Sequence, residues 1–552
     1  MSQESVVRAL AEPSFYPDRP ATVEHLQTHI SHVFIAGPYA YKLKKAVRFP
    51  FLDFSTPELR EHFCREEVRL NRRLCPSVYL GVLRVARGPD GVLRLDGPGA
   101  TLEHLVWMRR LPGRGMLPEL LAAGRVAPAM IEALAAELAA FHARAPAGPE
   151  VAAYASPAAL RARWAKEVGA VAGFVGRLIA AEDQEVVSDF GPCFIERHTE
   201  LLERRRAEGR IREGHGDLHA RNLCYVETED PECGSAPGLP PLEPGFYVFD
   251  CIEFSQEFRS NDVASEIAFL AMDLVGTGHD DLAGCLVRAY VARARDTELE
   301  RLLPFYACYR AYVRGKVDAL KSEEAEVGEA ARGEAELSAR RHFALSVRYA
   351  WSTTQPAIVA CVGLSGTGKT TLAAALAEAT GFAHLSTDEL RRHGALREAE
   401  PPRTGPGYGT GRYSAEARAT VYRTLAAAAD RAVAAGRAVV ADATFIRRAD
   451  RLRLAEVARA RGCPLIFLEC TAQEKTVRAR LEARAREQSS RRAGGGFARS
   501  DARWETYLVQ RDEREPLGAD EPHIAVDTTA GVAAARAAAL RALWKRQRRS
   551  GT

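Results

Sequence analysis

The chain has 552 residues, of which 47% are hydrophobic and 27% charged, values that are ordinary for a folded globular protein. Because a single hydrophobic core rarely grows beyond about 300 residues, two domains are expected. The 76 basic and 72 acidic residues leave a net charge of +4, which excludes a chain-wide field that would draw the protein onto DNA or an anionic membrane.

Segments that direct a chain to a membrane or to an oxidising compartment are not found in the sequence. The first residues lack a basic region followed by an apolar core, and no stretch approaches about 18 uninterrupted apolar residues. The 11 cysteines include no C-x-x-C pair, which favours reduced, buried thiols. We therefore expect a cytoplasmic protein without membrane contact, and the sequence leaves its oligomeric state open.

The first residues of chemical interest lie in a strand-like segment and a helix-like segment. Tyr39-Ala-Tyr-Lys42 reads as a strand, and Lys44 falls on the same face as Lys42 because side chains alternate along a strand. Adjacent Glu66 and Glu67 follow in the helix-like run from residue 64 to residue 70.

A dense polar motif then stands between two strand-like pieces that begin at about residue 211. It reads His215-Gly-Asp217-Leu-His219-Ala-Arg-Asn222. After an insertion rich in proline, glycine and glutamate at residues 227–245, Tyr247-Val-Phe-Asp250-Cys-Ile-Glu253 ends the second strand-like piece. The spacing indicates two metal ligands that face a base.

A long helical stretch at residues 303–347 leads to a break at residues 352–356, where a second domain is predicted to start. From there, apolar strand-like runs at residues 357–362, 438–441, 465–468 and 523–526 alternate with helical segments rich in alanine and arginine. This alternation is typical of a parallel sheet with crossover helices. We therefore expect domains at residues 1–350 and 351–552.

The second domain opens with a glycine-rich loop. Gly363-Leu-Ser-Gly-Thr-Gly-Lys-Thr370 matches G-x-x-x-x-G-K-[ST] at every specified position, and it lies between a predicted strand and a predicted helix. Glycines let the backbone N–H groups and the helix N-terminus surround phosphates. Lys369 is expected to reach the β- and γ-phosphates, and Thr370 to place its hydroxyl on Mg²⁺. The motif predicts an ATP or GTP site made of Gly363, Ser365, Gly366, Thr367, Gly368, Lys369 and Thr370.

Asp388 and Arg391 follow this loop, three residues apart, where they can address one substrate if a helix begins there. At this point the second half resembles the P-loop kinase family that includes polynucleotide kinases, zeta-type toxins and gluconate-kinase-like enzymes. The resemblance makes Asp388 the base that activates an acceptor hydroxyl, and Arg391 the clamp on a neighbouring phosphate. The alternative is helix capping by Asp388 with Arg391 in solvent.

The same resemblance assigns two further elements. Asp442, which ends the run Val439-Val-Ala-Asp442, corresponds to a second acidic element that supports Mg²⁺ or the substrate. Arg480 and Arg484 resemble the arginines of a lid helix that brings guanidinium groups onto the transferring phosphate. A solvated helix face is the alternative for these two arginines, because their whole neighbourhood is rich in arginine.

The polar motif of the first half resembles that of aminoglycoside and choline phosphotransferases, which are relatives of protein kinases. The resemblance implies that Asp217 orients or deprotonates the acceptor hydroxyl, and that Asn222 and Asp250 hold Mg²⁺ on ATP.

Carried over from the same family, Lys42 is the phosphate-binding lysine, in preference to Lys44, and Glu67 is its helix partner, with Glu66 left open. Residues 31–37 depart from the protein-kinase pattern because they lack a G-x-G-x-x-G loop.

Over nearly its whole length the chain resembles bacterial proteins described as bifunctional aminoglycoside phosphotransferase/ATP-binding proteins. The resemblance implies a bilobal α+β protein-kinase-like domain followed by an α/β P-loop domain with a parallel sheet. It implies an enzyme that moves the γ-phosphate of ATP, with Mg²⁺, to a hydroxyl acceptor. For the second domain a polynucleotide 5′-OH, a nucleotide or a sugar phosphate fits. An ATP-sensing regulator with one or both domains catalytically silent is the alternative.

Overall fold

The computed structural model describes residues 3–227, 238–324, 327–354, 357–393, 415–493 and 503–550. By the density of its internal contacts the chain divides into two compact units. The first comprises residues 1–169 and 191–316, and the second comprises residues 170–190 and 317–552. The predicted boundary between residues 350 and 351 stays a prediction.

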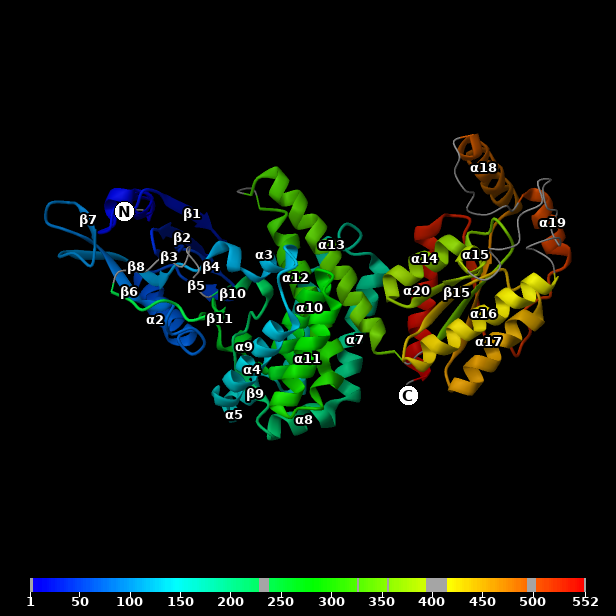
Figure 1. Cartoon of the computed structure of the whole chain (residues 1–552), viewed down its shortest axis with the longest axis horizontal. Coiled ribbons are helices and arrows are strands. Elements are labelled where there is room, and N and C mark those ends of the chain that lie inside the picture. Colours follow the sequence, from blue (N-terminus) through cyan, green and yellow to red (C-terminus); the bar gives the residue numbers. More distant parts are fainter. Residues whose placement is uncertain are drawn as a thin grey trace. The chain divides into compact units, whose positions relative to one another are not determined.

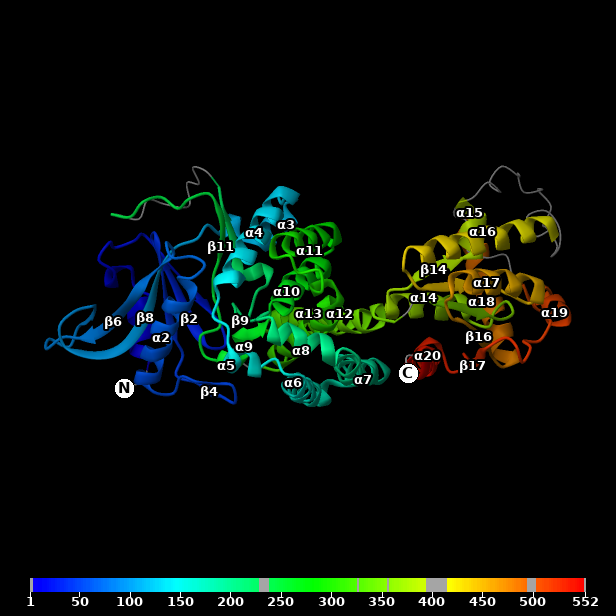
Figure 2. The ribbon, with the colours of Figure 1, turned by 90° about the horizontal axis from the view of Figure 1, so that it is seen from below.

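The first unit begins with a six-stranded antiparallel sheet in the order β1-β2-β3-β8-β6-β7 (Figure 1). Helix α2 packs against β6 and β8 (Figure 2). One core cluster on this sheet includes Phe34, Tyr41, Leu43 and Leu105. The elements of this part are α1 (Glu4–Leu10), β1 (Val23–Gln27), β2 (Ser31–Ala36), β3 (Tyr39–Lys44), β4 (Arg48–Phe49), β5 (Leu52–Asp53), α2 (Pro57–Asn71), β6 (Tyr79–Arg87), β7 (Leu93–Leu95) and β8 (Ala100–Arg109).

The rest of the first unit is mainly helical, with two short antiparallel ribbons that carry the polar motif. In one ribbon β9 pairs with β12, and in the other β10 pairs with β11. Helix α11 packs against both α4 and α10. The ribbon strands are β9 (Ile211–Glu213), β10 (Leu223–Val226), β11 (Gly245–Val248) and β12 (Ser260–Asp262).

The helices from residue 117 onward are α3 (Leu117–Ala122), α4 (Pro128–Arg144), α5 (Pro149–Ala153), α6 (Pro157–Ala170), α7 (Ala181–Arg197), α8 (Thr199–Ala207), α9 (Gln256–Arg259), α10 (Val263–Gly276), α11 (Asp280–Ala294) and α12 (Leu299–Lys321). No helix among the described residues is both long and apolar enough to cross a bilayer.

The second unit contains a five-stranded parallel sheet in the order β14-β15-β13-β16-β17. The central strand, β13, is buried along its whole length, as expected of a parallel sheet covered on both faces. The strands are β13 (Ile358–Val362), β14 (Ala383–Ser386), β15 (Val439–Asp442), β16 (Leu465–Thr471) and β17 (His523–Asp527).

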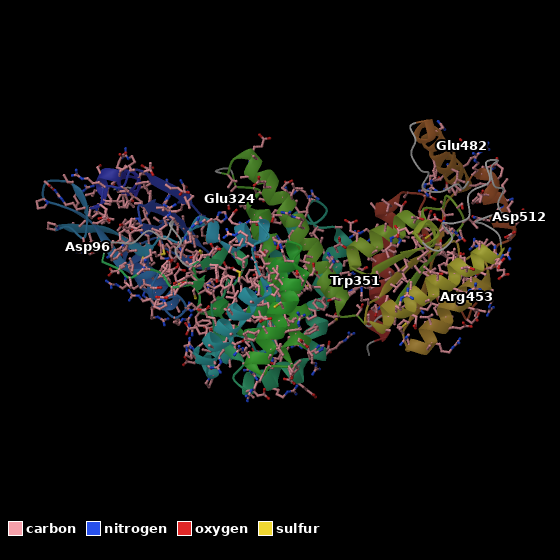
Figure 3. All side chains as sticks on the ribbon, in the orientation of Figure 1. Asp96, Glu324, Trp351, Arg453, Glu482 and Asp512 are labelled. Carbon is pink, nitrogen blue, oxygen red and sulfur yellow. The ribbon has the colours of Figure 1, made fainter. Side chains whose placement is uncertain are left out.

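The helices of the second unit are α13 (Glu329–Ser352), α14 (Lys369–Thr380), α15 (Thr387–His393), α16 (Ala415–Ala434), α17 (Arg448–Arg461), α18 (Glu474–Ala493), α19 (Trp504–Asp512) and α20 (Val532–Ser550). Trp351, labelled in Figure 3 near the end of α13, packs edge-on against Trp544 of α20, with ring centroids 5.0 Å apart.

The predicted parallel sheet with crossover helices is confirmed, and every strand predicted in the second half is present to within a few residues. The helical stretch predicted at residues 303–347 is also present, as two helices, since α12 ends at Lys321 and α13 begins at Glu329. The insertion at residues 227–245 joins β10 and β11, and its residues 228–237 lie outside the described chain.

Candidate functional sites

In the first unit, Lys42 of β3 lies between two carboxylates from distant segments. Its Nζ donates to Oε1 of Glu67 on α2 at 2.9 Å and to Oδ1 of Asp250, just beyond β11, at 2.5 Å. The side chain of Glu67 is fully buried, whereas that of Asp250 is 45% exposed. The geometry therefore joins a sheet lysine, a helix glutamate and a partly exposed aspartate in one cluster.

Lys44 belongs to the same cluster but lies deeper. Its Nζ donates to Oε2 of Glu67 at 2.6 Å and also to Glu253, and its side chain is fully buried. Glu66 points elsewhere, because it pairs with Arg69 one turn along α2. Of the two lysines that the sequence left open, Lys42 is therefore the one that contacts the partly exposed carboxylate of Asp250. Of the two glutamates, Glu67 is the one that pairs with the lysines.

Lys42 and Glu67 hold each other in the ionised state. Burial raises the pKa of Glu67, but Lys42 and Lys44 outweigh burial and lower it to about 2. Burial also lowers the pKa of Lys42, and there Asp250 and Glu67 outweigh it, so that the pKa lies well above the ordinary value. Lys42 therefore remains a cation that could bind phosphate.

Asp250 is held by its backbone. Its φ of 62° lies in the left-handed region, which a non-glycine residue adopts at a cost. Its N–H donates to the Tyr79 hydroxyl at 3.1 Å, and the preceding N–H of Phe249 donates to the Asn222 carbonyl at 3.1 Å. These two bonds fix the end of β11 both to the sheet and to the polar loop.

The polar loop between β9 and β10 places the other predicted residues. Asn222 Nδ2 donates to the Asp217 carbonyl at 2.9 Å and lies 3.3 Å from Asp217 Oδ2, while His219 Nε2 lies 3.2 Å from the same Oδ2. Burial opposes ionisation of Asp217, but the charge and hydrogen bond of His219, with Arg314, hold its pKa below the ordinary value. The carboxylate, 35% exposed, is thus ready to accept a hydrogen bond from a hydroxyl.

A buried carboxylate supports the polar loop. Glu266 of α10 accepts the N–H of Gly216 at 2.5 Å and lies 2.9 Å from His142 Nε2. Gly216 has a φ of 87°, and a Cβ there would lie 3.1 Å from the Phe258 carbonyl. Only glycine fits this position without strain. His215, which the sequence motif includes, orients the loop, since its Nε2 lies 2.8 Å from the Phe249 carbonyl.

The donor set of the first site fits a magnesium ion that arrives with its nucleotide. Asn222 and Asp250 offer the oxygens that Mg²⁺ prefers, and the ion is commonly bound by one or two carboxylates together with substrate phosphates. No cluster of three or more His, Cys, Asp or Glu side chains able to hold a metal by itself is found in the described ranges.

In the second unit, the glycine-rich loop runs from the end of β13 to the start of α14. Gly366 and Gly368 have φ values of 84° and 82°. A Cβ on Gly366 would lie 2.8 Å from Val477 Cγ1, and one on Gly363 would lie 2.7 Å from the Cys470 carbonyl. The loop therefore needs glycine for its conformation and for its close contact with the segments around it.

Lys369 and Thr370 begin α14, and Asp442 lies beside them at the end of β15. Thr370 Oγ1 donates to Asp442 Oδ1 at 3.3 Å, and Ser386 Oγ lies 3.4 Å from Asp442 Oδ2. Burial raises the pKa of Asp442, although the Lys369 charge and the Thr370 hydrogen bond oppose it. Thr370 and Asp442 are the hydroxyl and carboxylate that could hold Mg²⁺ next to a nucleotide.

Asp388 and Arg391 lie on α15 at the same edge of the sheet. Arg391 Nη1 donates to Asp388 Oδ1 at 3.0 Å. The N–H of Asp388 donates to Ser386 Oγ at 3.3 Å, so the serine hydroxyl satisfies the helix N-terminus. Asp388 also raises the pKa of Asp442 through like charge, which places the two carboxylates in one electrostatic neighbourhood.

Arg480 of α18 reaches the phosphate-binding loop. Its guanidinium donates to Oγ1 and O of Thr528 at 3.1 and 2.6 Å, and Nη1 lies 3.3 Å from where a Cβ of Gly368 would be. Arg484 lies one turn further along α18 and is half-buried. A fully solvated helix face is therefore wrong for Arg480.

Several residues of the two sites escape sequence reasoning. Glu253 pairs with Lys44, Tyr79 accepts the N–H of Asp250, and Glu266 accepts that of Gly216. In the second unit, Gln510 of α19 accepts the N–H of Ser365 at 2.8 Å. Only Glu253 carried a signal, because it stands in the Asp250 motif.

Two family models match separate parts of the chain. A family model described as the phosphotransferase enzyme family matches residues 48–234, and one described as an AAA domain matches residues 358–517. Uncharacterized proteins of Mycobacterium bovis and Mycobacterium tuberculosis are each 30% identical to the chain over 484 residues, which is 87% of this chain and 90% of theirs.

Among solved structures, a choline/ethanolamine kinase family protein from Mesorhizobium loti is 15% identical and covers 62% of this chain and 98% of its own, with a TM-score of 0.35. A gluconokinase from Sinorhizobium meliloti is 22% identical and covers 35% of this chain and 96% of its own, with a TM-score of 0.25.

The fold of the two units and the two matching models define a phosphotransferase enzyme of the kinase type. The chain belongs to the same family as the two mycobacterial proteins, and it carries a phosphotransferase-family domain followed by a P-loop kinase domain.

Proposed function

We propose that the chain transfers the γ-phosphate of ATP to hydroxyl acceptors at two sites, one in each predicted domain, residues 1–350 and 351–552. The observation that carries this proposal furthest is the contact of Thr370 with Asp442 at 3.3 Å, across 72 residues of sequence. A P-loop hydroxyl beside a strand-end carboxylate is the pair that binds nucleotide-associated Mg²⁺ in P-loop enzymes.

At the first site, Lys42 binds the phosphates of ATP, and Glu67 holds its ammonium group in place. Asp217 orients the acceptor hydroxyl and accepts its hydrogen bond, and Asn222 with Asp250 offers oxygens to Mg²⁺. When bound with ATP, Mg²⁺ would supply positive charge against the β- and γ-phosphate oxygens. An ionised Asp217 of low pKa suits this role, because positioning and charge provide most of the catalysis in phosphoryl transfer.

At the second site, the N–H groups of the loop from Gly363 to Gly368 surround the phosphates together with Lys369. Asp388 accepts the proton of the acceptor hydroxyl, and Arg391 binds a phosphate that the acceptor already carries. A polynucleotide 5′-OH, a nucleotide or a sugar phosphate meets this requirement. Arg480 and Arg484 add positive charge at the transferring phosphate.

The rival proposal, an ATP-sensing regulator, differs in one measurable respect: it binds ATP and passes phosphate to no acceptor. The full-length chain is therefore incubated with ATP labelled at the γ-phosphate and with fractionated cell extract, beside Asp217→Asn, Lys369→Met and the double variant.

Two sets of labelled products are expected, one lost in each single variant and both lost in the double variant. Labelling by the double variant equal to that of the unaltered chain would contradict both site assignments. ATP binding without any labelled product would favour the regulator.

A further inference from the structure

A basic cavity lies in the helical part of the first unit, away from the groups assigned to phosphoryl transfer. Its volume is about 460 Å³, and residues of helices α4 and α11 form much of its lining. Its lining consists of Ala136, Ala139, Ala140, His142, Ala143, Gly209, Arg210, Arg212, Val263, Tyr290, Arg293 and Ala294.

The charge of this lining has one sign. Arg210, Arg212 and Arg293 line the cavity, and no aspartate or glutamate does. Arginine remains protonated at any physiological pH. Arg210 lies 3.9 Å from the carboxylate of Asp296, and that carboxylate is already held by Arg205 at 2.6 Å. The cavity thus concentrates positive charge that the protein itself compensates only in part.

Most of the guanidinium donors are available to a ligand. Arg210 Nη1 donates to the Ala294 carbonyl at 3.4 Å, and Arg212 Nη1 donates to the Ala145 carbonyl at 3.0 Å. Each guanidinium has five N–H donors. Arg293 is exposed, and no hydrogen bond or ion pair joins it to another residue in the described part of the chain. If these arginines only capped the carboxyl ends of α4 and α11, that role would use one N–H donor of Arg210 and one of Arg212. It would give Arg293 no role at all.

The rest of the lining includes four alanines of α4 and a histidine that other residues hold in place. Four alanines of α4 leave the space open, and His142 is fixed because its Nδ1 lies 2.7 Å from the Tyr290 hydroxyl and its Nε2 lies 2.9 Å from Glu266 Oε2. Glu266 in turn accepts the N–H of Gly216 in the polar loop. An occupant of the cavity would therefore touch a histidine that is two hydrogen bonds from the residue before Asp217.

We propose that this cavity binds a phosphate-bearing small molecule, with the phosphate between Arg293, Arg212 and Arg210 and an apolar part against the alanines of α4. A phosphate monoester carries a charge of about −1.5 to −2 at neutral pH, which suits three guanidinium groups better than a single carboxylate does. The volume admits a metabolite and excludes a macromolecule.

The proposal is tested on the full-length chain with inorganic phosphate as the probe. Equilibrium dialysis against labelled phosphate, without magnesium and in a Lys369→Met background, removes the contribution of the P-loop. Arg293→Gln deletes a pocket cation that has no structural partner, and Ala140→Phe fills the cavity from an exposed position on α4 without a change of charge. The matched control is Arg288→Gln, which removes an equally exposed arginine of α11 that does not line the cavity.

Saturable binding is expected, weakened about tenfold by Arg293→Gln, abolished by Ala140→Phe and unchanged by Arg288→Gln. Equal weakening by both α11 variants would mean diffuse surface charge and would overturn the proposal, as would the absence of saturable binding. Acetate is the carboxylate probe, and acetate binding as tight as that of phosphate would overturn the assignment to phosphate.

Discussion

The two candidate sites assemble their charges in different ways. In the first unit, Lys42, Glu67, Asp217 and Asp250 come from a strand, a helix, a loop and a strand end. Ion pairs join Lys42 to Glu67 and Asp250, and Asn222 links the loop of Asp217 to the end of β11. In the second unit, the phosphate-binding groups belong to eight consecutive residues, from Gly363 to Thr370, and are largely backbone N–H groups.

This difference predicts how each site responds to mutation. A buried ion pair that loses one partner leaves an uncompensated charge. At the first site, substitution of Glu67 should therefore lower the free energy of unfolding. Lys369 and Thr370 lie on a half-buried to exposed surface, and their loss changes function while the fold remains. The predictions below test this contrast, from the largest expected effect to the smallest.

Asp217→Asn is expected to lower transfer at the first site by roughly 10²- to 10⁴-fold, because the amide keeps the shape of the side chain and loses the charge that orients the hydroxyl. The thermal midpoint should change little, since the bond from Asn222 to the Asp217 carbonyl is retained. Product-resolved kinetics provide the measurement. A parallel loss of the products of the second site would contradict the independence of the sites.

Lys369→Met and Thr370→Ala are each expected to lower transfer at the second site by about 10²- to 10³-fold, because each removes charge or metal coordination from the transition state. Thr371→Ala is the matched control: it removes an exposed hydroxyl from the next residue of α14. Circular dichroism should show the same fold for all three variants. Full activity in both Lys369→Met and Thr370→Ala would rule out the P-loop assignment.

Glu67→Gln is expected to lower the free energy of unfolding by about 3 kcal/mol, because Lys42 and Lys44 both lose a carboxylate and keep only Asp250 and Glu253. The neighbouring Glu66→Gln should change it by less than about 0.5 kcal/mol, since Glu66 pairs with Arg69 at the surface. Denaturant titration of the two variants measures the difference.

The loss of stability caused by Glu67→Gln should depend on pH. Folding lowers the pKa of Glu67 from 4.5 to about 2. The carboxylate therefore contributes its full stability above about pH 4.5 and loses that contribution as the pH falls toward 2. The stability gap between the unaltered chain and Glu67→Gln should narrow over this acidic range, and a gap that widens there would contradict the ion-pair assignment.

The features that the sequence predicts best are those that lie within one short, continuous segment. The strand β13, the loop from Gly363 to Thr370 and the helix α14 follow one another along the chain, so their order and chemistry are visible in a single motif. The break between α12 and α13 is not visible, because the composition rich in alanine and glutamate continues through it.

Contacts across long stretches of sequence are the part that could not be predicted. Lys44 meets Glu253 across 209 residues, and Ser365 meets Gln510 across 145 residues. Each depends on how sheets and helices pack, and no local pattern pairs Lys44 with Glu253 or Ser365 with Gln510. The family resemblance pointed to Lys42 and Glu67, whereas nothing pointed to Tyr79 or Glu266.

The smallest expected effect concerns Arg391 at the second site. Arg391→Lys should raise KM for a phosphate-bearing acceptor by about tenfold and leave KM for ATP nearly unchanged, because a point charge replaces a planar fork that binds two phosphate oxygens. Lysine can still pair with Asp388, whose carboxylate accepts from Arg391 at 3.0 Å, so that the start of α15 should stay folded.

Asp388→Asn separates the two roles of this pair. It removes the proposed base and should lower kcat with a much smaller change in KM for the acceptor. Steady-state kinetics with oligonucleotides, nucleotides and sugar phosphates give both constants. If Arg391 only forms an intrahelical ion pair, Arg391→Lys will leave KM for every acceptor unchanged, because a lysine three residues from Asp388 preserves that pair. Selective phosphorylation of an acceptor without a phosphate by this site would exclude the adjacent-phosphate model altogether.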